Sequence, residues 1–266
     1  MKNKIKYIRK LVDPGIPIIE KAAGAAFGST LGFFYGGLPG TAIGAAGGQI
    51  FADQFYKIGE EFRKRYLSKR ESVRIGAVAG YALERIKTNL ENNMQVRKDD
   101  FFNLDPVTDR SAADEILEGT LNTAKNEHEE KKLHYLGNLV ANIPFHPEID
   151  RYQANYLLRI AGRLSYRQFC ILALFERKLN HLLSMNNPDL GKMSNQNDLT
   201  LIQEIDEMMI MNLLISSRAS LIGMRNLTPG EIKLRELGKT LHLMMNLDEI
   251  NYSETDTLAG ILSDPV

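Results

Sequence analysis

Cysteine is nearly absent from this 266-residue sequence, and the single Cys170 excludes an intramolecular disulfide framework. The thiol lies in the apolar run 169–174, which predicts a buried and inert cysteine rather than a nucleophile. A hydrophobic signal region is also missing, because charged residues at 9–10 and an Asp-Pro pair at 13–14 interrupt the start of the chain. We therefore expect a cytoplasmic protein.

The usual motifs of catalytic and metal centres are missing as well. The sequence has no H-E-x-x-H pair and no G-x-S-x-G elbow, and the glycine-rich stretch 36–41 lacks the Gly-Lys-Ser/Thr ending that holds phosphate and magnesium. Glu130 and His134 share a helical face, with His146 as a third candidate, but a zinc site needs three or four ligands at recognisable spacing. We expect neither an enzyme nor a cofactor or metal.

Charge of either sign is absent from residues 22–52. A glycine costs roughly 1 kcal/mol in a helix relative to alanine, so a regular series of glycines needs a compensating role. Glycines four residues apart share one helical face and let a second backbone approach closely. The Gly-Leu-Pro-Gly sequence at 37–40 predicts a turn, and hence a glycine-zipper helical hairpin. The ladder consists of Gly24, Gly28, Gly32, Gly36, Gly40, Gly44 and Gly48.

Two interpretations of this hairpin stay open. Uncharged small-x-x-x-small ladders are typical of helix packing in membranes. Each arm of about 15 residues would reach only ~22 Å, which is short of the ~30 Å hydrocarbon core. A re-entrant or oligomer-lined hairpin therefore suits the sequence better than two full spans. The alternative is a hairpin buried in a soluble fold.

The charges around the ladder are distributed unevenly, although the net charge is zero. Residues 1–74 carry 13 Lys/Arg and 6 Asp/Glu, a balance of +7, and residues 75–266 carry 20 and 27, a balance of −7. The basic part is expected to face something anionic: lipid, nucleic acid or the acidic body of a neighbouring subunit. A basic amphipathic helix is predicted over 54–74, and its cations at the membrane surface would be Arg63, Lys64, Arg65, Lys69 and Arg70.

Capping signals and periodicity predict a mainly α-helical protein with a hairpin, a central helical bundle and a winged-helix-like C-terminal domain. The capping box Ser-Ala-Ala-Asp at 111–114 starts a helix expected to reach about 133. Further helices are predicted at 135–143, 150–162, 166–184, 198–213 and 230–247. The predicted domains are a basic region 1–90, a linker 91–110, a helical domain 111–164, a winged-helix-like domain 165–250 and a loose tail 251–266.

The order helix, helix, β-hairpin, helix over 165–247 resembles a winged-helix domain. Its recognition helix would be 198–213, which carries four acidic residues and no lysine or arginine. Contacts to phosphate need cations, so this helix disfavours DNA binding. Docking of a protein partner through 165–250 fits the acidic surface better.

A family resemblance runs over residues 111–247. The sequence E-E-K-K-L-H-Y-L-G-N-L-V-A-N at 129–142 and L-L-R-I-A-G-R-L-S at 157–165 resemble the helical core of Abi-alpha bacterial proteins. The Leu-Thr-Pro sequence at 227–229 also fits, although Thr-Pro-Gly-Glu replaces the more common Thr-Pro-Leu-Gly. The resemblance implies a role in abortive infection, a bacterial antiviral defence against phage, and carries over no catalytic residue.

These features together predict an oligomeric effector that acts at the cytoplasmic (inner) membrane, by inserting or assembling through the hairpin. Basic flanks on both sides of the hairpin would keep its ends on the cytoplasmic side and attract anionic headgroups. The alternative is a soluble interaction or adaptor protein whose glycine hairpin is an oligomerisation core. Homo-oligomers are expected in both cases, and pore formation is left open.

The ladder leads to a first testable prediction. Gly32→Leu or Gly44→Leu should abolish assembly, because a large side chain on the packing face forces the backbones apart. Leu38→Ala, at the turn, should have a smaller effect. Sedimentation of the expressed protein measures the outcome, and equal tolerance of leucine along the whole ladder would contradict the prediction.

Overall fold

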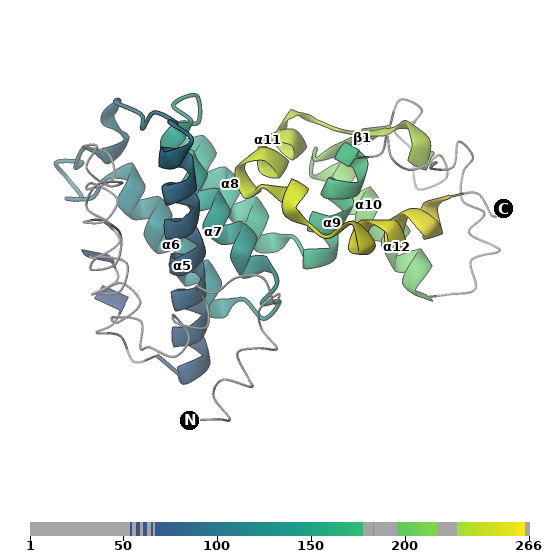
Figure 1. The fold of residues 1–266 in the computed structure, drawn as a ribbon, viewed down its shortest axis with the longest axis horizontal. Coiled ribbons are helices and arrows are strands. Elements are labelled where there is room, and N and C mark those ends of the chain that lie inside the picture. Colours follow the sequence, from purple (N-terminus) through teal and green to yellow (C-terminus); the bar gives the residue numbers. More distant parts are fainter. Residues whose placement is uncertain are drawn as a thin grey trace. The chain divides into compact units, whose positions relative to one another are not determined.

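Figure 1 shows the computed structural model of the chain, in which the mainly α-helical fold is confirmed. The structure describes residues 54, 57, 58, 61, 62, 65, 67–177, 183, 196–216 and 228–263. The glycine ladder at 22–52 lies outside the described residues. The chain divides into two compact units, residues 1–163 and 164–266, so the polar stretch 91–110 lies inside the first unit rather than between domains.

The first unit is built from helices. Helix α5 packs mainly against α7 and also against α6, and α8 packs against α6. The described elements are α5 (Lys69–Glu91), the 3-10 turn η1 (Asp100–Phe102), α6 (Ala112–Asn126), α7 (Lys132–Asn142), the 3-10 turn η2 (Ile143–Phe145) and α8 (Arg151–Arg163).

Serine capping boxes start several of the helices. The predicted box at Ser111 and Asp114 is confirmed at the start of α6. A second box, formed by Ser68 and Glu71, begins α5. A continuous basic helix was predicted over 54–74. Ser68 interrupts it, because an N-cap residue has extended backbone, and α5 starts directly after Ser68.

The contact between α5 and α7 depends on a glycine. A Cβ atom at Gly137 would lie 2.7 Å from the Cβ of Tyr81 and 3.0 Å from the carbonyl oxygen of Val78, so only glycine permits this approach. Polar and aromatic pairs follow one another every four residues on both helices, which shows that the two helices run parallel. These pairs are Tyr81 with His134 (ring centroids 4.5 Å apart), Arg85 with Asn138 (3.3 Å) and Asn89 with Asn142 (2.8 Å).

Arg97 fixes the loop between α5 and α6. Its Nε donates to the Asp99 carboxylate at 2.7 Å and its Nη1 to the Ile149 carbonyl at 2.7 Å. Its backbone N–H donates to the Pro144 carbonyl at 2.9 Å, and its guanidinium lies 4.3 Å from the Phe101 ring centroid. A buried arginine thus joins this loop to the segment after α7.

The helix predicted from 111 to about 133 is shorter, because α6 ends at Asn126 and α7 begins at Lys132. Glu127 has extended backbone, which ends α6, and its buried carboxylate forms an ion pair with Lys132. Lys132 Nζ also donates to the Gly162 carbonyl at 3.2 Å, in the last turn of α8. The buried pair therefore holds the turn between α6 and α7 against the end of α8.

The second unit combines helices with a short two-stranded antiparallel sheet, in which Leu214 pairs with Leu234 and Ser216 with Ile232. A serine also caps α9, since the Ser165 hydroxyl accepts from the Gln168 backbone N–H at 3.1 Å. The described elements are α9 (Tyr166–Arg177), α10 (Gln196–Ile210), β1 (Leu214–Ser216), the 3-10 turn η5 (Pro229–Glu231), β2 (Ile232–Leu234), α11 (Glu236–Met245), the 3-10 turn η6 (Leu247–Glu249) and α12 (Tyr252–Leu262).

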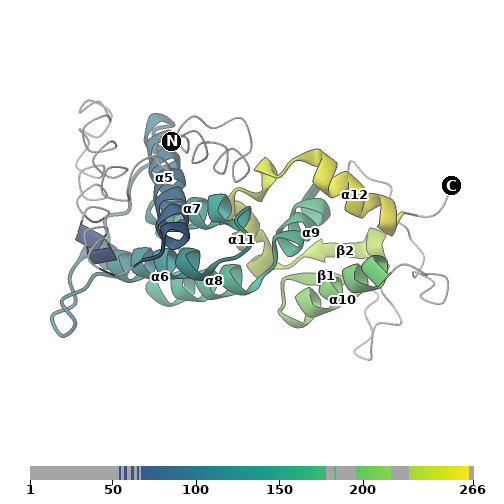
Figure 2. The same cartoon turned by 90° about the horizontal axis from the view of Figure 1, so that it is seen from below.

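Two predictions about the C-terminal part are wrong. The final helix expected over 230–247 begins only at Glu236, because residues 232–234 alternate buried and exposed side chains and pair as β2. The tail expected to be loose forms α12, which is capped by Asn251 and packs against α9 (Figure 2). Leu258 and Leu262 are buried there, so periodic apolar positions outweigh the polar composition.

Two helical glycines of the second unit provide a matched test. A Cβ at Gly238 would lie 2.3 Å from the Leu213 carbonyl oxygen, whereas a Cβ at Gly260 meets nothing within 4 Å. We expect Gly238→Ala to lower the free energy of unfolding by about 1–3 kcal/mol, because the obstructing atom belongs to the backbone. Gly260→Ala should raise it by up to about 1 kcal/mol. Urea unfolding of the full chain measures both, and effects of the same sign would contradict this packing.

Candidate functional site

Helix α6 carries a row of polar side chains four residues apart: Asp114, Glu118 and Asn122. Residues at this spacing lie on one face of a helix, so the row is a direct result of the sequence. Cations of the segment 54–74 lie along this row and at the turn after α6. We call the resulting set the charge-paired surface: Lys57, Arg65, Arg70 and Arg74 with Asp114, Glu118 and Glu130.

The first contacts of the charge-paired surface are at the start of α6. Lys57 Nζ lies 3.8 Å from Oδ2 of the buried Asp114. The Gln54 amide donates to the Ser111 hydroxyl at 3.2 Å, so the segment contacts the capping box itself. The basic segment therefore first contacts α6 at its capped N-terminus. The other oxygen of Asp114, Oδ1, is buried there without a hydrogen-bond partner.

Arg65 makes the central contact. Its guanidinium donates to Glu118 at 2.7 Å and to Asn122 at 3.4 Å, and lies 4.2 Å from the Phe62 ring centroid. Phe62 and Ile58 are fully buried, so apolar contacts also fix this part of the segment. Arg65 itself stays exposed.

Two arginines of α5 complete the surface at the turn between α6 and α7. Arg70 Nε lies 2.9 Å and Arg74 Nε 3.3 Å from Oε1 of Glu130, which is almost fully buried. Arg74 also donates to the Lys125 carbonyl at 3.1 Å. Since Lys125 is in the last turn of α6, the cation is placed where the helix dipole favours positive charge.

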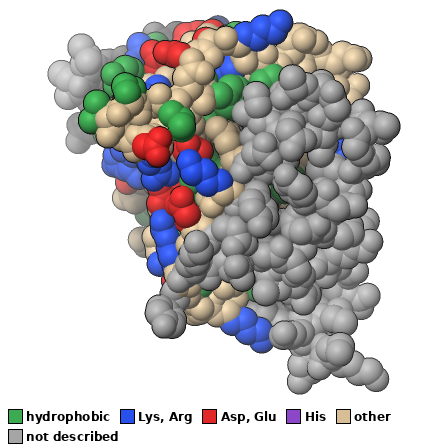
Figure 3. Space-filling view, turned by 90° about the vertical axis from the view of Figure 1, so that its left-hand side faces the viewer, with side chains coloured by type: hydrophobic (Ala, Val, Ile, Leu, Met, Phe, Trp, Pro, Cys, Tyr) green, Lys and Arg blue, Asp and Glu red, His purple; other side chains and the backbone are tan. Residues whose placement is uncertain are grey.

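The hydrogen bond from Arg65, together with one from Arg110, holds the pKa of Glu118 below its ordinary value of 4.5 against the opposing effect of burial. A carboxylate whose pKa is lowered in the folded state stabilises it at pH values above the ordinary pKa. That contribution is lost as the pH falls through the lowered pKa. The contact between Arg65 and Glu118 therefore contributes its full stabilisation at neutral pH. Figure 3 shows acidic and basic side chains side by side on this face of the molecule.

The structure places only some of the predicted site residues. Arg65 and Arg70 belong to the charge-paired surface, and Lys69 is exposed at the first position of α5. Arg63, Lys64 and the seven ladder glycines lie outside the described residues. Sequence reasoning missed the acidic partners, although the four-residue spacing of Asp114 and Glu118 was a usable signal.

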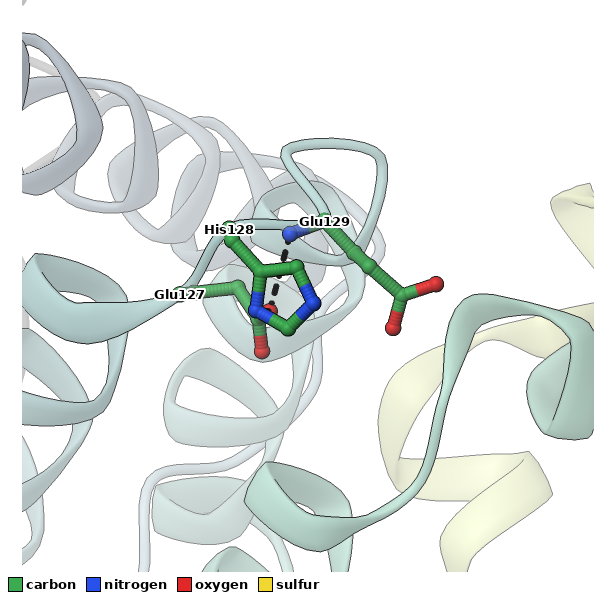
Figure 4. Close-up of side chains that lie close together, drawn as sticks. All are labelled: Glu127, His128 and Glu129. Atoms are coloured by element: carbon green, nitrogen blue, oxygen red, sulfur yellow. Dashed lines mark hydrogen bonds and ion pairs between the residues drawn. The ribbon is translucent and has the colours of Figure 1, made fainter.

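A cluster of potential metal ligands lies in the turn between α6 and α7. Glu127, His128 and Glu129 bring ligand atoms within 4.8 Å of one another (Figure 4). The Glu127 carboxylate is already committed, because it accepts the Glu129 backbone N–H at 2.9 Å and pairs with Lys132. His134, the candidate from the sequence, packs against the Tyr81 and Tyr135 rings. Within this cluster Glu127 is thus held in a buried ion pair, while the His128 side chain is exposed.

Comparisons with family models, curated proteins and solved structures give no match to the chain. Among the described residues, no helix combines the length and the apolar composition that crossing a membrane requires.

Glu118 and Glu115 provide a matched test of the charge-paired surface. Both are on α6, but Glu115 pairs with Arg151 of α8 instead of the basic segment. An exposed pair contributes about 0.2–1 kcal/mol, so Glu118→Gln should speed hydrogen exchange of residues 57–65 by up to about fivefold. Glu115→Gln should leave that exchange unchanged. If both variants behave alike, Glu118 does not hold the segment.

Proposed function

We propose that the chain is an oligomeric effector that acts at the cytoplasmic membrane, with the glycine-laddered hairpin as its inserting or assembling element. The uncharged composition of 22–52 and the basic flanks support this role. The proposal assigns no catalysis, cofactor or metal to the chain.

The charge-paired surface is the observation that carries the proposal. The basic segment that follows the hairpin rests on carboxylates of its own chain, with Arg65 and Arg70 exposed. Exposed ion pairs contribute about 0.2–1 kcal/mol each, and a cation near an anionic membrane gains about 1 kcal/mol. For the exposed Arg65–Glu118 pair the two partners are close in energy, so an anionic lipid surface can replace Glu118 as the partner of Arg65. Glu130 is nearly buried and binds both Arg70 and Arg74, so the exposed Arg70 can leave it while Arg74 still neutralises it.

The second unit supports a sensing or docking role. Its order of α9, α10, β1, β2 and α11 is consistent with the winged-helix interpretation. Helix α10 is acidic, and its Glu204 accepts from Arg167 of α9 at 2.5 Å. An acidic recognition helix favours a protein partner over DNA. We propose that this unit docks a protein partner or trigger.

The cellular purpose is proposed from the resemblance to Abi-alpha proteins. Abortive infection requires an effector that stops the infected cell, and damage to the membrane by an inserted or pore-forming hairpin would do so. The resemblance covers 111–247, which is the body rather than the hairpin. Membrane action is therefore supported by the hairpin and its flanks, and phage defence by the body.

The alternative is a soluble adaptor whose hairpin is an oligomerisation core. The same charge-paired surface favours it in one respect, because acidic groups of the body already neutralise cations of the basic segment. In that case the segment stays on α6 and the glycine face packs against other copies.

Vesicle binding distinguishes the two functions. Replacing Arg63, Lys64, Arg65, Lys69 and Arg70 by Gln should weaken binding to anionic vesicles at least about tenfold, since each cation contributes about 1 kcal/mol. Glu118→Gln with Glu130→Gln should strengthen binding, because the competing carboxylates are neutralised. Co-sedimentation with vesicles containing anionic phospholipid measures both, and neutral vesicles are the control.

The adaptor predicts a different pattern. If no variant changes co-sedimentation and added salt has no effect, the membrane proposal fails. Fractionation of cells expressing the full chain then shows its location. Carbonate and high-salt washes separate insertion from adhesion to the surface.

A further inference from the structure

Helix α8 presents an exposed stripe of aromatic and basic side chains. Tyr152, Tyr156, Arg159 and Arg163 follow one another at intervals of four, three and four residues, so they lie on one face. Tyr152 is 83% exposed, and the Arg159 guanidinium lies 5.7 Å from the Tyr156 ring centroid. Tyrosine and arginine are the residue types that contribute most to binding energy in protein interfaces. We call this set the α8 stripe.

Helix α10 of the second unit presents a complementary surface. Its exposed face carries Gln203, Glu207 and Ile210 at intervals of four and three residues, with Asp206 beside them. Ile210 is 75% exposed. Ile215, on the adjoining strand β1, is also exposed. We call Asp206, Glu207 and Ile210 the α10 patch.

The order of side chains along the two helices is complementary. The α8 stripe runs from aromatic at Tyr152 and Tyr156 to basic at Arg159 and Arg163. The α10 patch runs from acidic at Asp206 and Glu207 to apolar at Ile210. When the helices lie antiparallel with Tyr156 opposite Ile210, the equal three-residue intervals bring Arg159 opposite Glu207. The next four-residue interval brings Arg163 opposite Gln203, about one helical turn from the two carboxylates, so the basic end of the stripe faces the acidic end of the patch.

We propose that the α8 stripe of one copy docks antiparallel on the α10 patch of a second copy. The occupant is a second copy because the complementary charges and apolar groups are both carried by this chain. The contact joins two different surfaces, so each copy keeps one stripe and one patch free for further copies. Such a head-to-tail contact builds rings or open arrays. This inference rests on the oligomeric part of the proposed function. It gives the oligomer a second interface, in the helical body, besides the one proposed for the hairpin.

Cross-linking between copies tests the register. The only natural thiol is removed by Cys170→Ser, after which Tyr156→Cys is placed in one full-length chain and Ile210→Cys in another. Mixing the two chains under mild oxidation should give a disulfide-linked dimer on a non-reducing gel. The matched control pairs Tyr156→Cys with Leu243→Cys on α11, which is 58% exposed but outside the patch. Equal yields for both mixtures would overturn the proposal.

Charge reversal tests the same contact without cysteines. Arg159→Glu with Arg163→Glu, or Asp206→Arg with Glu207→Arg, should each weaken association of the full chain about tenfold in light scattering. Mixing the two double variants should restore it, because each opposed pair is then complementary again. Lys87→Glu with Lys239→Glu makes the same change in net charge as the arginine variant and should have no effect.

The outcomes separate this contact from the membrane role. Restored association in the mixture supports self-docking, whether or not the chain binds vesicles. A mixture that stays monomeric overturns it, even when vesicle binding is intact, and assigns the stripe to a contact within one chain or to another partner. Tyr152→Ala, at the more exposed of the two stripe tyrosines, should weaken association without unfolding, which guards against a folding defect in the charge variants.

Discussion

The close approach of α5 and α7 at Gly137 is the constraint on which the first unit depends. With no side chain at this position, the α7 backbone reaches Val78 and Tyr81, and the polar pairs along the two helices come into register. The same packing directs the first turns of α5 toward the turn after α6. Arg70 and Arg74 then meet Glu130. A helix contact that looks purely structural therefore determines which cations of the basic segment are neutralised.

Each unit also uses an arginine to hold an irregular segment by its carbonyl groups. Arg97 does this between α5 and α6, and Arg177 at the end of α9 donates to the Ile250 carbonyl at 2.8 Å while lying 4.4 Å from the Tyr252 ring centroid. A guanidinium has five N–H donors in a fixed plane, so one side chain satisfies several carbonyls that no helix or strand pairs. These contacts are the reason that the predicted linker and the predicted loose tail are ordered parts of the fold.

The sequence predicts the bounds of a helix well where a local signal sets them. It predicts them less well where a contact with a distant part of the chain sets them. The cap at Ser111 was predicted, because the whole capping box lies within four residues. The end of α6 was missed, since it depends on burial of Glu127 with Lys132. Strand β2 was missed because three residues gain a partner only through β1. For the candidate site, Arg65 and Arg70 were identified but Lys57 and Arg74 were not, and the acidic partners of the two identified arginines lie more than 50 residues away along the chain.

The charge-paired surface also has a kinetic consequence. A cluster of cations normally steers a protein toward an anionic surface from a distance and raises its rate of encounter. Arg65 pairs with Glu118, and Arg70 and Arg74 share Glu130, so the carboxylates offset part of the positive charge of the segment and weaken its field at a distance. If the chain acts at a membrane as we propose, its approach would be steered less than that of an unpaired cationic cluster, and release of the segment from α6 would limit its capture. The rate of capture would then depend on how often the basic segment leaves α6. It would no longer rise with lipid concentration once vesicles are abundant.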